Sequence, residues 1–282
     1  MSDSLTPVAA LWSFLGRQKT GRIPEWLRNS ARRKFSRSQR GKFIVCQTSP
    51  GFRMECRIGD PLDNTIYFEG EFEAELRMSL ERLAPAISTV VDVGCNIGYV
   101  SCLLAKLTGG RARIISVDPN PEMISRCAAN LKLNGFSAEL EACAMGRVEE
   151  VRTFNVPKHR PSFASFGQLT HDCEAIKVPI RRLDEMARKK GLAEIDLLKI
   201  DVEGFEPEVL GGVGDLKVKN IYLEFSPRNL KQCGFAPVEL WALPLWKKYR
   251  LAMIEVGSAQ PLYFEPGNPI GGQTEIVWAQ LI

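Results

Sequence analysis

The sequence predicts an α/β protein built on a mostly parallel sheet of about seven strands, with helices on both faces and a small N-terminal β extension. Near-continuous apolar runs alternate with helix-like segments, which is typical of parallel strands that are covered on both faces. The strand-like runs are TVVDVG, ARIISVD, AELEACAM, IDLLKID and NIYLEF, and the helix-like segments are Tyr99 to Leu107, Pro121 to Leu133 and Glu206 to Leu210.

Residues 1–40 form a basic, aromatic-bearing leader that Gly21 and Pro24 divide into two short helical pieces at most. Residues 1–54 hold eleven Lys and Arg against Asp3 and Glu25, whereas the whole chain carries only +4. Such a segment could contact an anionic membrane surface, or it could pack on the rest of the protein or stay disordered. Binding of nucleic acid is the least favoured of these interpretations.

Residues 41–85 are expected to form a strand and helix extension, and residues 86–282 the main domain. In the extension, KFIVCQT, GFRMECRI and NTIYF alternate like strands, and Glu71 to Leu83 follows as a helix. In the main domain, the segment Val151–Arg182 is an excursion with two further strand candidates around a long polar loop, and such loops tend to be functional. The tail predicts a helix around Glu239 to Tyr249 and two strands, RLAMIEV and TEIVWAQL.

Composition places the chain among ordinary globular proteins, with 45% hydrophobic and 25% charged residues. Its apolar runs are shorter than the roughly 18 to 20 residues that a membrane-spanning helix needs. The eight cysteines include no CxxC pair, so neither a zinc site nor a disulfide framework is indicated. A reducing, cytoplasmic compartment is the simplest expectation.

A group of acidic, glycine and asparagine residues falls where predicted strands end. In an open α/β sheet, ligands bind at the carboxyl ends of the strands, where the strand order reverses. Glycines in the first turn would let the backbone pass closely under a ligand, and an acid after the second strand could accept both hydroxyls of a ribose. The residues are Asp92, Gly94, Asn96, Gly98, Asp118 and Asp201.

The spacing of the glycines separates two classes of nucleoside ligand. A dinucleotide fingerprint needs glycine at the first, third and sixth positions of the turn, and counting from Gly94 these positions hold Asn96 and Tyr99. The chain also lacks the GxxxxGK[ST] pattern of a phosphate-binding P-loop. The remaining pattern, acid-x-Gly-x-x-x-Gly, suits an adenosyl ligand that carries a carboxylate and an ammonium group.

Four segments resemble the FkbM family of S-adenosylmethionine-dependent methyltransferases, which have the Rossmann-like class I fold. The similarity extends from about Phe43 to the C-terminus, and LLKIDVEG is its most specific part. The leader lies outside it. The segments are DVGCNIG (92–98), SVDPNP (116–121), LDEMARKKGLAEIDLLKIDVEGFEPEVLGG (183–212) and YLEFSP (222–227).

The resemblance implies a cofactor site and an antiparallel position for the final strand, TEIVWAQL. Residues 94, 96 and 98 (Gly94, Asn96 and Gly98) would line the methionine part of S-adenosylmethionine. Asp92 would reach its ammonium group, directly or through water, and Asp118 would hold the ribose. Ala142 and Cys143, at the end of the third strand, would border the adenine.

The segment Lys199–Gly204 lies where methyltransferases of this class place residues near the transferred methyl group. A hydroxyl nucleophile needs a proton acceptor, and Asp201 is the first candidate, followed by Glu203 and Glu224. The histidines at positions 159 and 171 (His159 and His171) fall on the polar loop of the excursion, where they could act on the substrate or be ordinary surface residues. The charges around Asp201 could also form a structural ion pair at a strand end.

The expected activity is methyl transfer from S-adenosylmethionine to a hydroxyl oxygen of a sugar, glycan or secondary-metabolite-like acceptor. A nucleotide-dependent oxidoreductase and a non-catalytic S-adenosylmethionine-binding module share the fold and stay open as alternatives. A base methyltransferase would carry a [DN]PP[YF]-type loop after the fourth strand, where this chain has DVEG. The histidines and carboxylates show no spacing typical of metal ligands.

Overall fold

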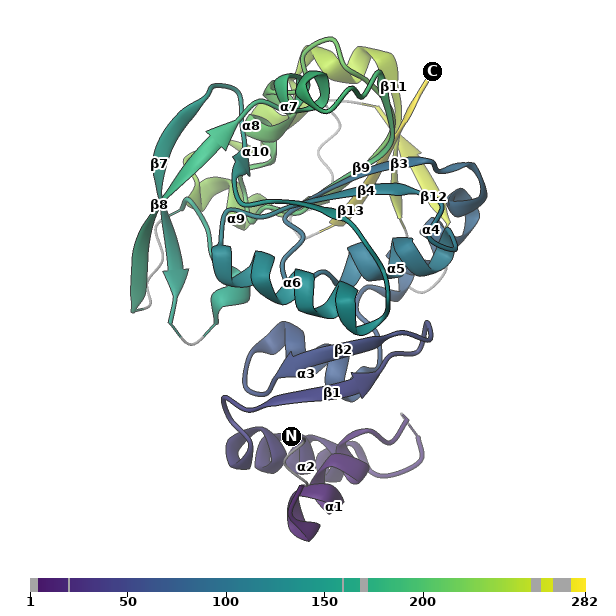
Figure 1. Ribbon diagram of the computed structural model, residues 1–282, viewed down its shortest axis with the longest axis vertical. Helices are drawn as coiled ribbons and strands as arrows, with labels where there is room; N and C mark the ends of the chain where they lie inside the picture. Colours follow the sequence, from purple (N-terminus) through teal and green to yellow (C-terminus); the bar gives the residue numbers. More distant parts are fainter. Residues whose placement is uncertain (1–4, 20, 159, 168–171, 255–259, 266–274) are drawn as a thin grey trace. The chain divides into compact units, whose positions relative to one another are not determined.

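The computed structural model describes residues 5–19, 21–158, 160–167, 172–254, 260–265 and 275–282 (Figure 1). Backbone contacts divide the chain into two units, Met1–Glu73 and Ala74–Ile282. Within the described ranges, no helix combines the length and the apolarity that crossing a lipid bilayer requires.

The first unit is a small helical unit with one β hairpin. Its elements are α1 (Pro7–Gly16), α2 (Glu25–Ser38), the antiparallel strands β1 (Phe43–Gln47) and β2 (Arg53–Arg57), and α3 (Pro61–Glu69). Aromatic contacts join three of these elements: the ring of Phe35 stacks on Tyr67 at 5.1 Å between centroids, and the Ser13 and Tyr67 hydroxyl oxygens lie 2.5 Å apart. The two helices of the leader are therefore tied to α3 by a shared aromatic core.

The expected strand NTIYF is wrong, because these residues form most of α3. The side chain of Asp60 accepts a hydrogen bond from the N–H of Leu62 at 3.0 Å, and Pro61 occupies the first helical position. An Asp cap followed by proline favours a helix start, since it satisfies one free N–H and presets the backbone. Gly70, at φ 79°, ends the helix in the left-handed conformation. The cap at Asp60, Pro61 and Gly70 thus decided for a helix, although the β-branched and aromatic residues of NTIYF favour a strand.

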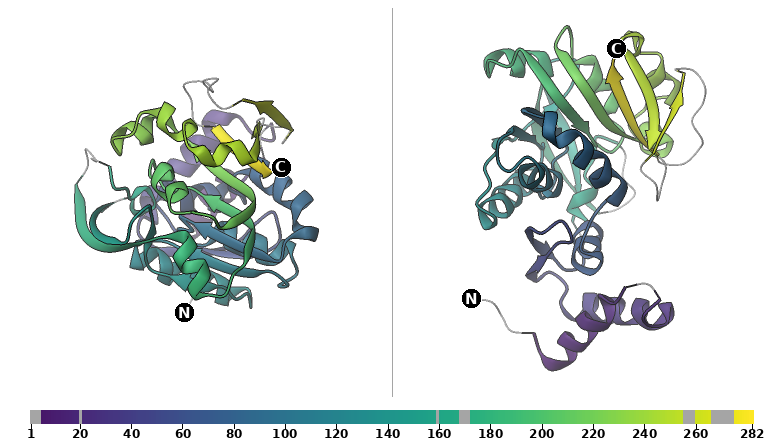
Figure 2. Two further views of the ribbon diagram at one scale, coloured as in Figure 1. Left: turned by 90° about the horizontal axis from the view of Figure 1, so that it is seen from above. Right: turned by 90° about the vertical axis from the view of Figure 1, so that its right-hand side faces the viewer.

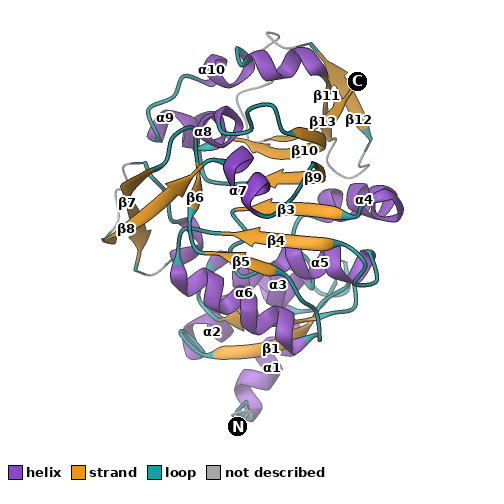
Figure 3. Ribbon diagram, turned by 45° about the horizontal axis from the view of Figure 1, so that its top comes forward, coloured by secondary structure: helices purple, strands orange, loops and turns teal. Residues whose placement is uncertain are grey.

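The second unit is built on an eight-stranded sheet in the order β12-β11-β13-β10-β9-β3-β4-β5 (Figure 3). The five strands from β5 to β10 in this order are parallel to one another. The strands are β3 (Thr89–Val93), β4 (Arg113–Val117), β5 (Glu139–Glu141), β9 (Glu194–Ile200), β10 (Lys217–Phe225), β11 (Tyr249–Ile254), β12 (Pro261–Phe264) and β13 (Glu275–Leu281).

This arrangement confirms the expected α/β class with a mostly parallel sheet. The final strand, β13, lies between β10 and β11 and is antiparallel to both, as expected (Figure 2). The sheet has one strand more than the seven expected, because β12 adds to the edge beside β11. The chain runs outward from β3 through β4 to β5 and then continues on the other side of β3 with β9, so the strand order reverses between β3 and β9.

Helices cover both faces of the sheet. On one face, alternate residues of the central strands form a continuous apolar core with α7 (Leu183–Lys189), α8 (Glu206–Gly211), α9 (Pro227–Gln232) and α10 (Pro237–Trp241). On the other face, the hydroxyl of Ser101 from α5 donates to Asp92 on β3 at 2.6 Å. The remaining helices of this unit are α4 (Ala74–Leu83), η1 (Ala84–Ala86), α5 (Tyr99–Leu107), α6 (Pro121–Leu133), η2 (Pro161–Phe163) and η3 (Pro244–Lys248).

Three further expectations needed correction. The run AELEACAM is not one strand: β5 ends at Glu141, and β6 (Ala144–Met145) joins a separate three-stranded sheet with β8 (Cys173–Arg181) and β7 (Glu150–Pro157). The expected helix at 71–83 begins only with α4, and the expected helix at 239–249 is broken into α10 and η3. Pro244 explains the second break, since proline cannot continue a helix from the preceding turn.

The amino ends of the central strands are fixed by Asp196 on β9. Its Oδ2 accepts the N–H groups of Ser88 and Thr89 at 2.8 and 2.9 Å, and its Oδ1 lies 2.7 Å from Nζ of Lys219. Burial alone would raise the pKa of Asp196, but the Lys219 ammonium and the two N–H groups outweigh it and lower this pKa below its usual value. The ionised form of Asp196 therefore stabilises the folded state.

We expect Asp196→Asn to lower the free energy of unfolding by about 1–3 kcal/mol at neutral pH, because the charged acceptor of three donors is lost. A group with a lowered folded pKa stabilises above its unfolded pKa, about 3.9, and this contribution disappears as the pH falls through the folded pKa. Urea unfolding from pH 7 to pH 3 measures the difference from the wild type. Asp215→Asn, at an exposed position, is the control, and a difference that persists unchanged at pH 3 would contradict the explanation.

Candidate active site

The loops after β3 and β9 meet where the strand order of the sheet reverses. The N–H of Gly94 donates to the carbonyl oxygen of Val117, the last residue of β4, at 2.9 Å. The N–H of Asp201 donates to the carbonyl oxygen of Val93 at 3.1 Å. These bonds hold the loop after β3 between β4 on one side and the loop after β9 on the other, at the edge where ligands bind in such sheets.

Two glycines of this loop are required by neighbouring parts of the protein. Gly94 has a φ of 77°, and a Cβ atom there would overlap the carbonyl oxygen of Asp201. Gly98 has a φ of 84°, and a Cβ there would lie 2.6 Å from Sγ of Cys127 on α6. The atoms that require glycine at these two positions belong to the loop after β9 and to α6. The room that both glycines are expected to leave for a ligand stays a prediction.

A row of polar residues crosses four strands beneath the site. The register pairs Ser116 with Asp92, Asp92 with Lys199, and Lys199 with Tyr222, so all four side chains lie on one face of the sheet. Asp92 is 0% exposed and Lys199 is 6% exposed. Charges buried this deeply are costly unless they are paired and hydrogen-bonded.

Lys199 supplies the pairing. Its Nζ lies 3.6 Å from Oδ1 of Asp92 and 3.2 Å from Oδ2 of Asp201, and it donates to the carbonyl oxygen of Gly94 at 3.0 Å. The other carboxylate oxygen of Asp92 accepts from Ser101. Asp92 is thus enclosed beneath the loop, so its carboxylate supports Gly94 through Lys199 and has no surface to offer directly to a ligand.

Asp118, which directly follows β4, carries two backbone hydrogen bonds. Its Oδ2 accepts the N–H of Asn96 at 3.0 Å, and its Oδ1 accepts the N–H of Asn120 at 2.8 Å. Burial raises the pKa of Asp118 to about 6, although the two N–H groups oppose this shift. Each oxygen of a carboxylate has a second lone pair, so Asp118 can still accept hydroxyl groups.

The end of β5 lies next to Asp118, whose N–H donates to the carbonyl oxygen of Glu141 at 3.1 Å. The two residues expected to border an adenine then diverge. Ala142 is exposed, whereas the side chain of Cys143 is buried in the core, where burial raises the pKa of its thiol to about 12. Of this pair, only Ala142 presents its side chain to the surface beside Asp118.

The loop after β9 gathers three carboxylates. Glu203 has a φ of 53°, and its Oε2 accepts a hydrogen bond from Nδ2 of Asn229 at 2.6 Å. Burial and then the negative charges of Asp201 and Glu206 raise the pKa of Glu203 to about 8. Glu206 is buried, with a pKa raised to about 7 by its burial, and its Oε1 accepts the N–H groups of Val202 and Gly204. The loop and the first residue of α8 therefore hold one ion-paired acid, Asp201, and two acids with raised pKa values, Glu203 and Glu206.

Glu224 lies near the end of β10, beside the same loop. Leu223 of β10 is paired with Ile200, the last residue of β9, and the next residues along are Glu224 in β10 and Asp201 directly after β9. The side chain of Glu224 is half-buried. The structure thus brings all three proposed catalytic acids to the carboxyl edge of β9 and β10.

The excursion reaches the site through its short η2 segment. Nδ2 of Asn96 donates to the carbonyl oxygen of Ser162 at 3.2 Å, and the hydroxyl of Ser165 donates to the carbonyl oxygen of Glu203 at 3.1 Å. One stretch of four residues therefore contacts both loops of the site. The two histidines predicted in this region, His159 and His171, lie outside the described residues.

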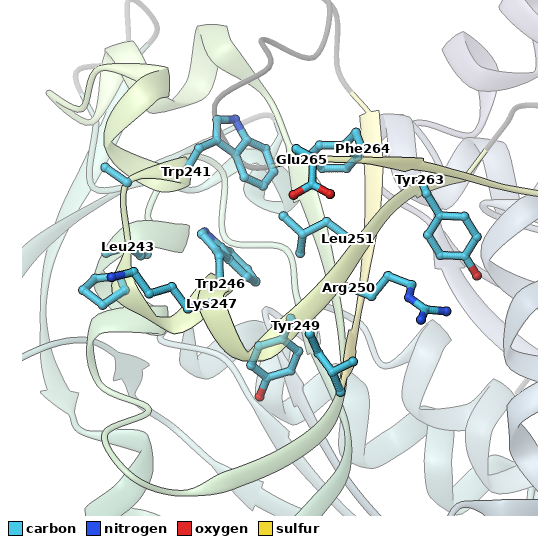
Figure 4. Close-up of a pocket in the computed structure, with 13 residues that line it drawn as sticks. Trp241, Leu243, Trp246, Lys247, Tyr249, Arg250, Leu251, Tyr263, Phe264 and Glu265 are labelled. Carbon is cyan, nitrogen blue, oxygen red and sulfur yellow. The ribbon is translucent and has the colours of Figure 1, made fainter.

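A separate hollow of about 930 Å³ opens at the other end of the strands (Figure 4). Trp241, Trp246 and Tyr263 line it together with Arg250. The hydroxyl of Tyr249 in its wall donates to the carbonyl oxygen of Val218, near the start of β10. This places the hollow at the amino edge of the sheet, away from the carboxylates, so we do not assign it to the chemistry.

The model of the Methyltransferase FkbM domain matches residues 92–253, which include every site residue named above. The chain belongs to this family. It is a methyltransferase, and the class I, Rossmann-like arrangement expected from the sequence is the one that the strand order shows.

Curated relatives of this FkbM methyltransferase include three whose names describe an activity. It is 28% identical over 187 residues to the AMB antimetabolite synthetase AmbE of Pseudomonas aeruginosa, an alignment that covers 51% of this chain but 9% of the synthetase. It is 26% identical to the 2-O-methyltransferase NoeI of Sinorhizobium fredii, in an alignment that covers 54% of this chain and 67% of NoeI. It is also 26% identical to the 31-O-demethyl-FK506 methyltransferase FkbM of Streptomyces tacrolimicus, in an alignment that covers 45% of this chain and 59% of that enzyme.

Four residues of this FkbM methyltransferase act around the site without having been predicted as part of it. Lys199 is named in the sequence only as the start of the segment Lys199–Gly204, although its position two residues before Asp201 puts both on one face of the strand. No signal of spacing identifies the others, because their partners lie in distant segments. They are Ser101, Glu206 and Asn229.

We expect Gly94→Ala to be far more harmful than Gly109→Ala, although both glycines have positive φ values, 77° and 61°. A Cβ on Gly109 meets nothing within 4 Å, so that variant should lose only about 1–2 kcal/mol for the left-handed conformation. A Cβ on Gly94 overlaps Asp201, so we expect a further loss of about 2–4 kcal/mol. Urea unfolding of both variants measures this, and equal losses would show that the contact with Asp201 does not require glycine.

Proposed function

We propose that this FkbM methyltransferase uses S-adenosylmethionine to methylate a hydroxyl oxygen of a sugar, glycan or secondary-metabolite-like acceptor. The names of NoeI and of FkbM both describe O-methylation, which supports an oxygen acceptor. The observation that carries the proposal is the placement of Glu203, an acid whose pKa is raised to about 8, at the edge of the sheet where Asp118 and the glycine loop also lie.

The residues at this edge fit the proposed cofactor. Gly98 begins α5 without a side-chain cap, and the first-turn N–H groups of a helix have no partner within the helix, so they suit a carboxylate such as that of a methionine moiety. Asp118 can accept ribose hydroxyls, and Ala142 beside it can border a base. Gly94 and Asn96 shape the loop after β3, which lies between Asp118 and the start of α5. Lys199, paired with Asp92, holds the carbonyl oxygen of Gly94 in this loop.

When bound, S-adenosylmethionine supplies an electrophilic methyl group that an oxygen displaces in line from sulfur. The chain then has to align the hydroxyl and remove its proton. Glu203 is the best-suited proton acceptor, because a carboxylate with a pKa near 8 is a stronger base than an ordinary one. Asn229 holds Oε2, so that Oε1 can face the hydroxyl.

The other two acids have different proposed roles. The Oδ2 atom of Asp201 lies 3.2 Å from Nζ of Lys199, so this carboxylate is already engaged in an ion pair. Its negative charge also raises the pKa of Glu203. Glu224, on the neighbouring strand, would orient the acceptor. The order of preference among the acids therefore becomes Glu203 before Asp201, with Glu224 third.

Calorimetry tests the donor. We expect S-adenosylmethionine and S-adenosylhomocysteine to bind and NAD not to bind. Asp118→Asn should weaken binding of both about 10- to 100-fold, because a charged acceptor of the ribose hydroxyls is lost. Asp215→Asn, which removes the same charge from an exposed position near the amino edge, should bind like the wild type. Binding of NAD without binding of the sulfonium compound would refute the donor assignment.

The pH dependence of methyl transfer tests the base. Because Glu203 must be ionised to accept a proton and its pKa in the free protein is about 8, we expect kcat/KM to rise with pH up to about 8 and then level off. Glu203→Gln should lower kcat about 10²- to 10⁴-fold, leave KM nearly unchanged and remove this inflection.

Two further variants make the pH test specific. Asn229→Ala removes a donor to the charged form of Glu203, so the inflection should move to higher pH. Glu149→Gln, at an exposed position, should keep the wild-type profile. An inflection near pH 8 that persists in Glu203→Gln would assign the base to another group.

A further inference from the structure

Helix α1 packs against the rest of the first unit through small residues. Ala9, Ser13 and Gly16 are buried, and their spacing of four and three places them on one face of the helix. A Cβ on Gly16 would lie 2.9 Å from the ring of Phe68, so the packing is close. The contact of α1 with its own unit therefore uses little apolar surface.

The opposite face of α1 is apolar and exposed. Val8, Leu11 and Phe14 are 62%, 51% and 64% exposed, and Leu15 is half-buried beside them. At 100° per residue these four side chains span about 120° of the helix, centred opposite the small residues. Ordinary surface helices bury such a stripe and expose their polar side. Here the orientation is reversed.

Helix α2 also exposes an aromatic residue, and it exposes two arginines on the same side. Its buried face carries Ala31 and Phe35, whereas Trp26 is 70% exposed. Arg33 and Arg37 follow Trp26 by seven and eleven residues, so the three side chains share one face, and both arginines are exposed. The two helices are linked by a cation–π contact, in which Nζ of Lys34 lies 4.3 Å from the ring centroid of Trp12.

We propose that the exposed sides of these two helices, together called the leader face (Val8, Leu11, Phe14, Trp26, Arg33 and Arg37), dock on an anionic lipid bilayer. Exposed aliphatic side chains can enter the acyl boundary, Trp favours the headgroup level, and arginines attract anionic headgroups. Eleven Lys and Arg against two acids in residues 1–54 supply the complementary charge. The inference concerns attachment and does not depend on the methyl donor or acceptor.

Charge and chemistry favour a bilayer over other occupants of the leader face. A nucleic acid would be attracted by the arginines and could stack on Phe14 and Trp26, but it offers no apolar partner to the aliphatic side chains of Val8 and Leu11. A second copy of the chain would bring the same excess of positive charge to the interface, which opposes association. A bilayer with anionic headgroups satisfies both the cations and the aliphatic stripe.

Co-sedimentation of the full chain with vesicles tests the proposal. We expect the protein to pellet with vesicles of phosphatidylcholine and phosphatidylglycerol (3:1) at low salt, and to remain in solution with phosphatidylcholine alone. Raising the salt to about 0.5 M should weaken binding steeply, because it screens the arginine contribution. Leu11→Ser with Phe14→Ser, and separately Arg33→Gln with Arg37→Gln, should each lower the partition coefficient about tenfold or more.

Matched variants in the second unit serve as controls. Val238→Ser with Leu262→Ser removes two exposed apolar side chains elsewhere, and Lys247→Gln with Lys248→Gln removes two exposed charges elsewhere. Both should bind vesicles like the wild type, and all variants should keep the wild-type melting temperature because every site is exposed. Equal binding to neutral vesicles, wild-type binding by the leader-face variants, or binding of RNA without binding of vesicles would each overturn the proposal.

Discussion

The ammonium group of Lys199 is the contact on which the site depends. It lies between the carboxylates of Asp92 and Asp201 and also holds the carbonyl oxygen of Gly94, so it joins β3, β9 and both of their loops. A buried ion pair contributes little net stability, and losing one partner costs about 3–5 kcal/mol because the other charge is left unpaired. The main effect of Lys199 is therefore to fix the positions of the two loops relative to each other, since it contacts Gly94 in one and Asp201 in the other.

The same buried row explains why the glycine loop has its sequence. Gly94 must be glycine because the backbone of Asp201 approaches it, and that approach is fixed by Lys199 from below. The backbone of Asn96 has a positive φ. Its side chain donates to the carbonyl oxygen of Ser162, and its backbone N–H donates to Asp118. A pattern that reads as ligand binding in the sequence is thus partly a pattern of contacts between strand ends.

Regular elements could be predicted where a single local signal decided them. The helices Tyr99–Leu107 and Pro121–Leu133 begin and end where expected, because apolar periodicity marks both, and the cap at Asn120 with Pro121 also marks the start of the second. The strand NTIYF failed because the cap at Asp60 outweighed its composition, and AELEACAM failed because β6 pairs with β8, far along the chain. The positions of the site acids were predictable from strand ends, but the Asn229–Glu203 contact was not, since it joins segments 26 residues apart.

The excursion is joined to the site by packing as well as by hydrogen bonds. The side chains of Asn96 and Ser165 donate to the carbonyl oxygens of Ser162 and Glu203. Ile180 of β8 packs against Phe205 at the start of α8, and the guanidinium of Arg152 on β7 lies 5.5 Å from the ring centroid of Phe205. Exposed side chains of these strands, such as that of Val151, can change without loss of this packing. The excursion therefore combines a fixed connection to the loop after β9 with an exposed side whose sequence can vary.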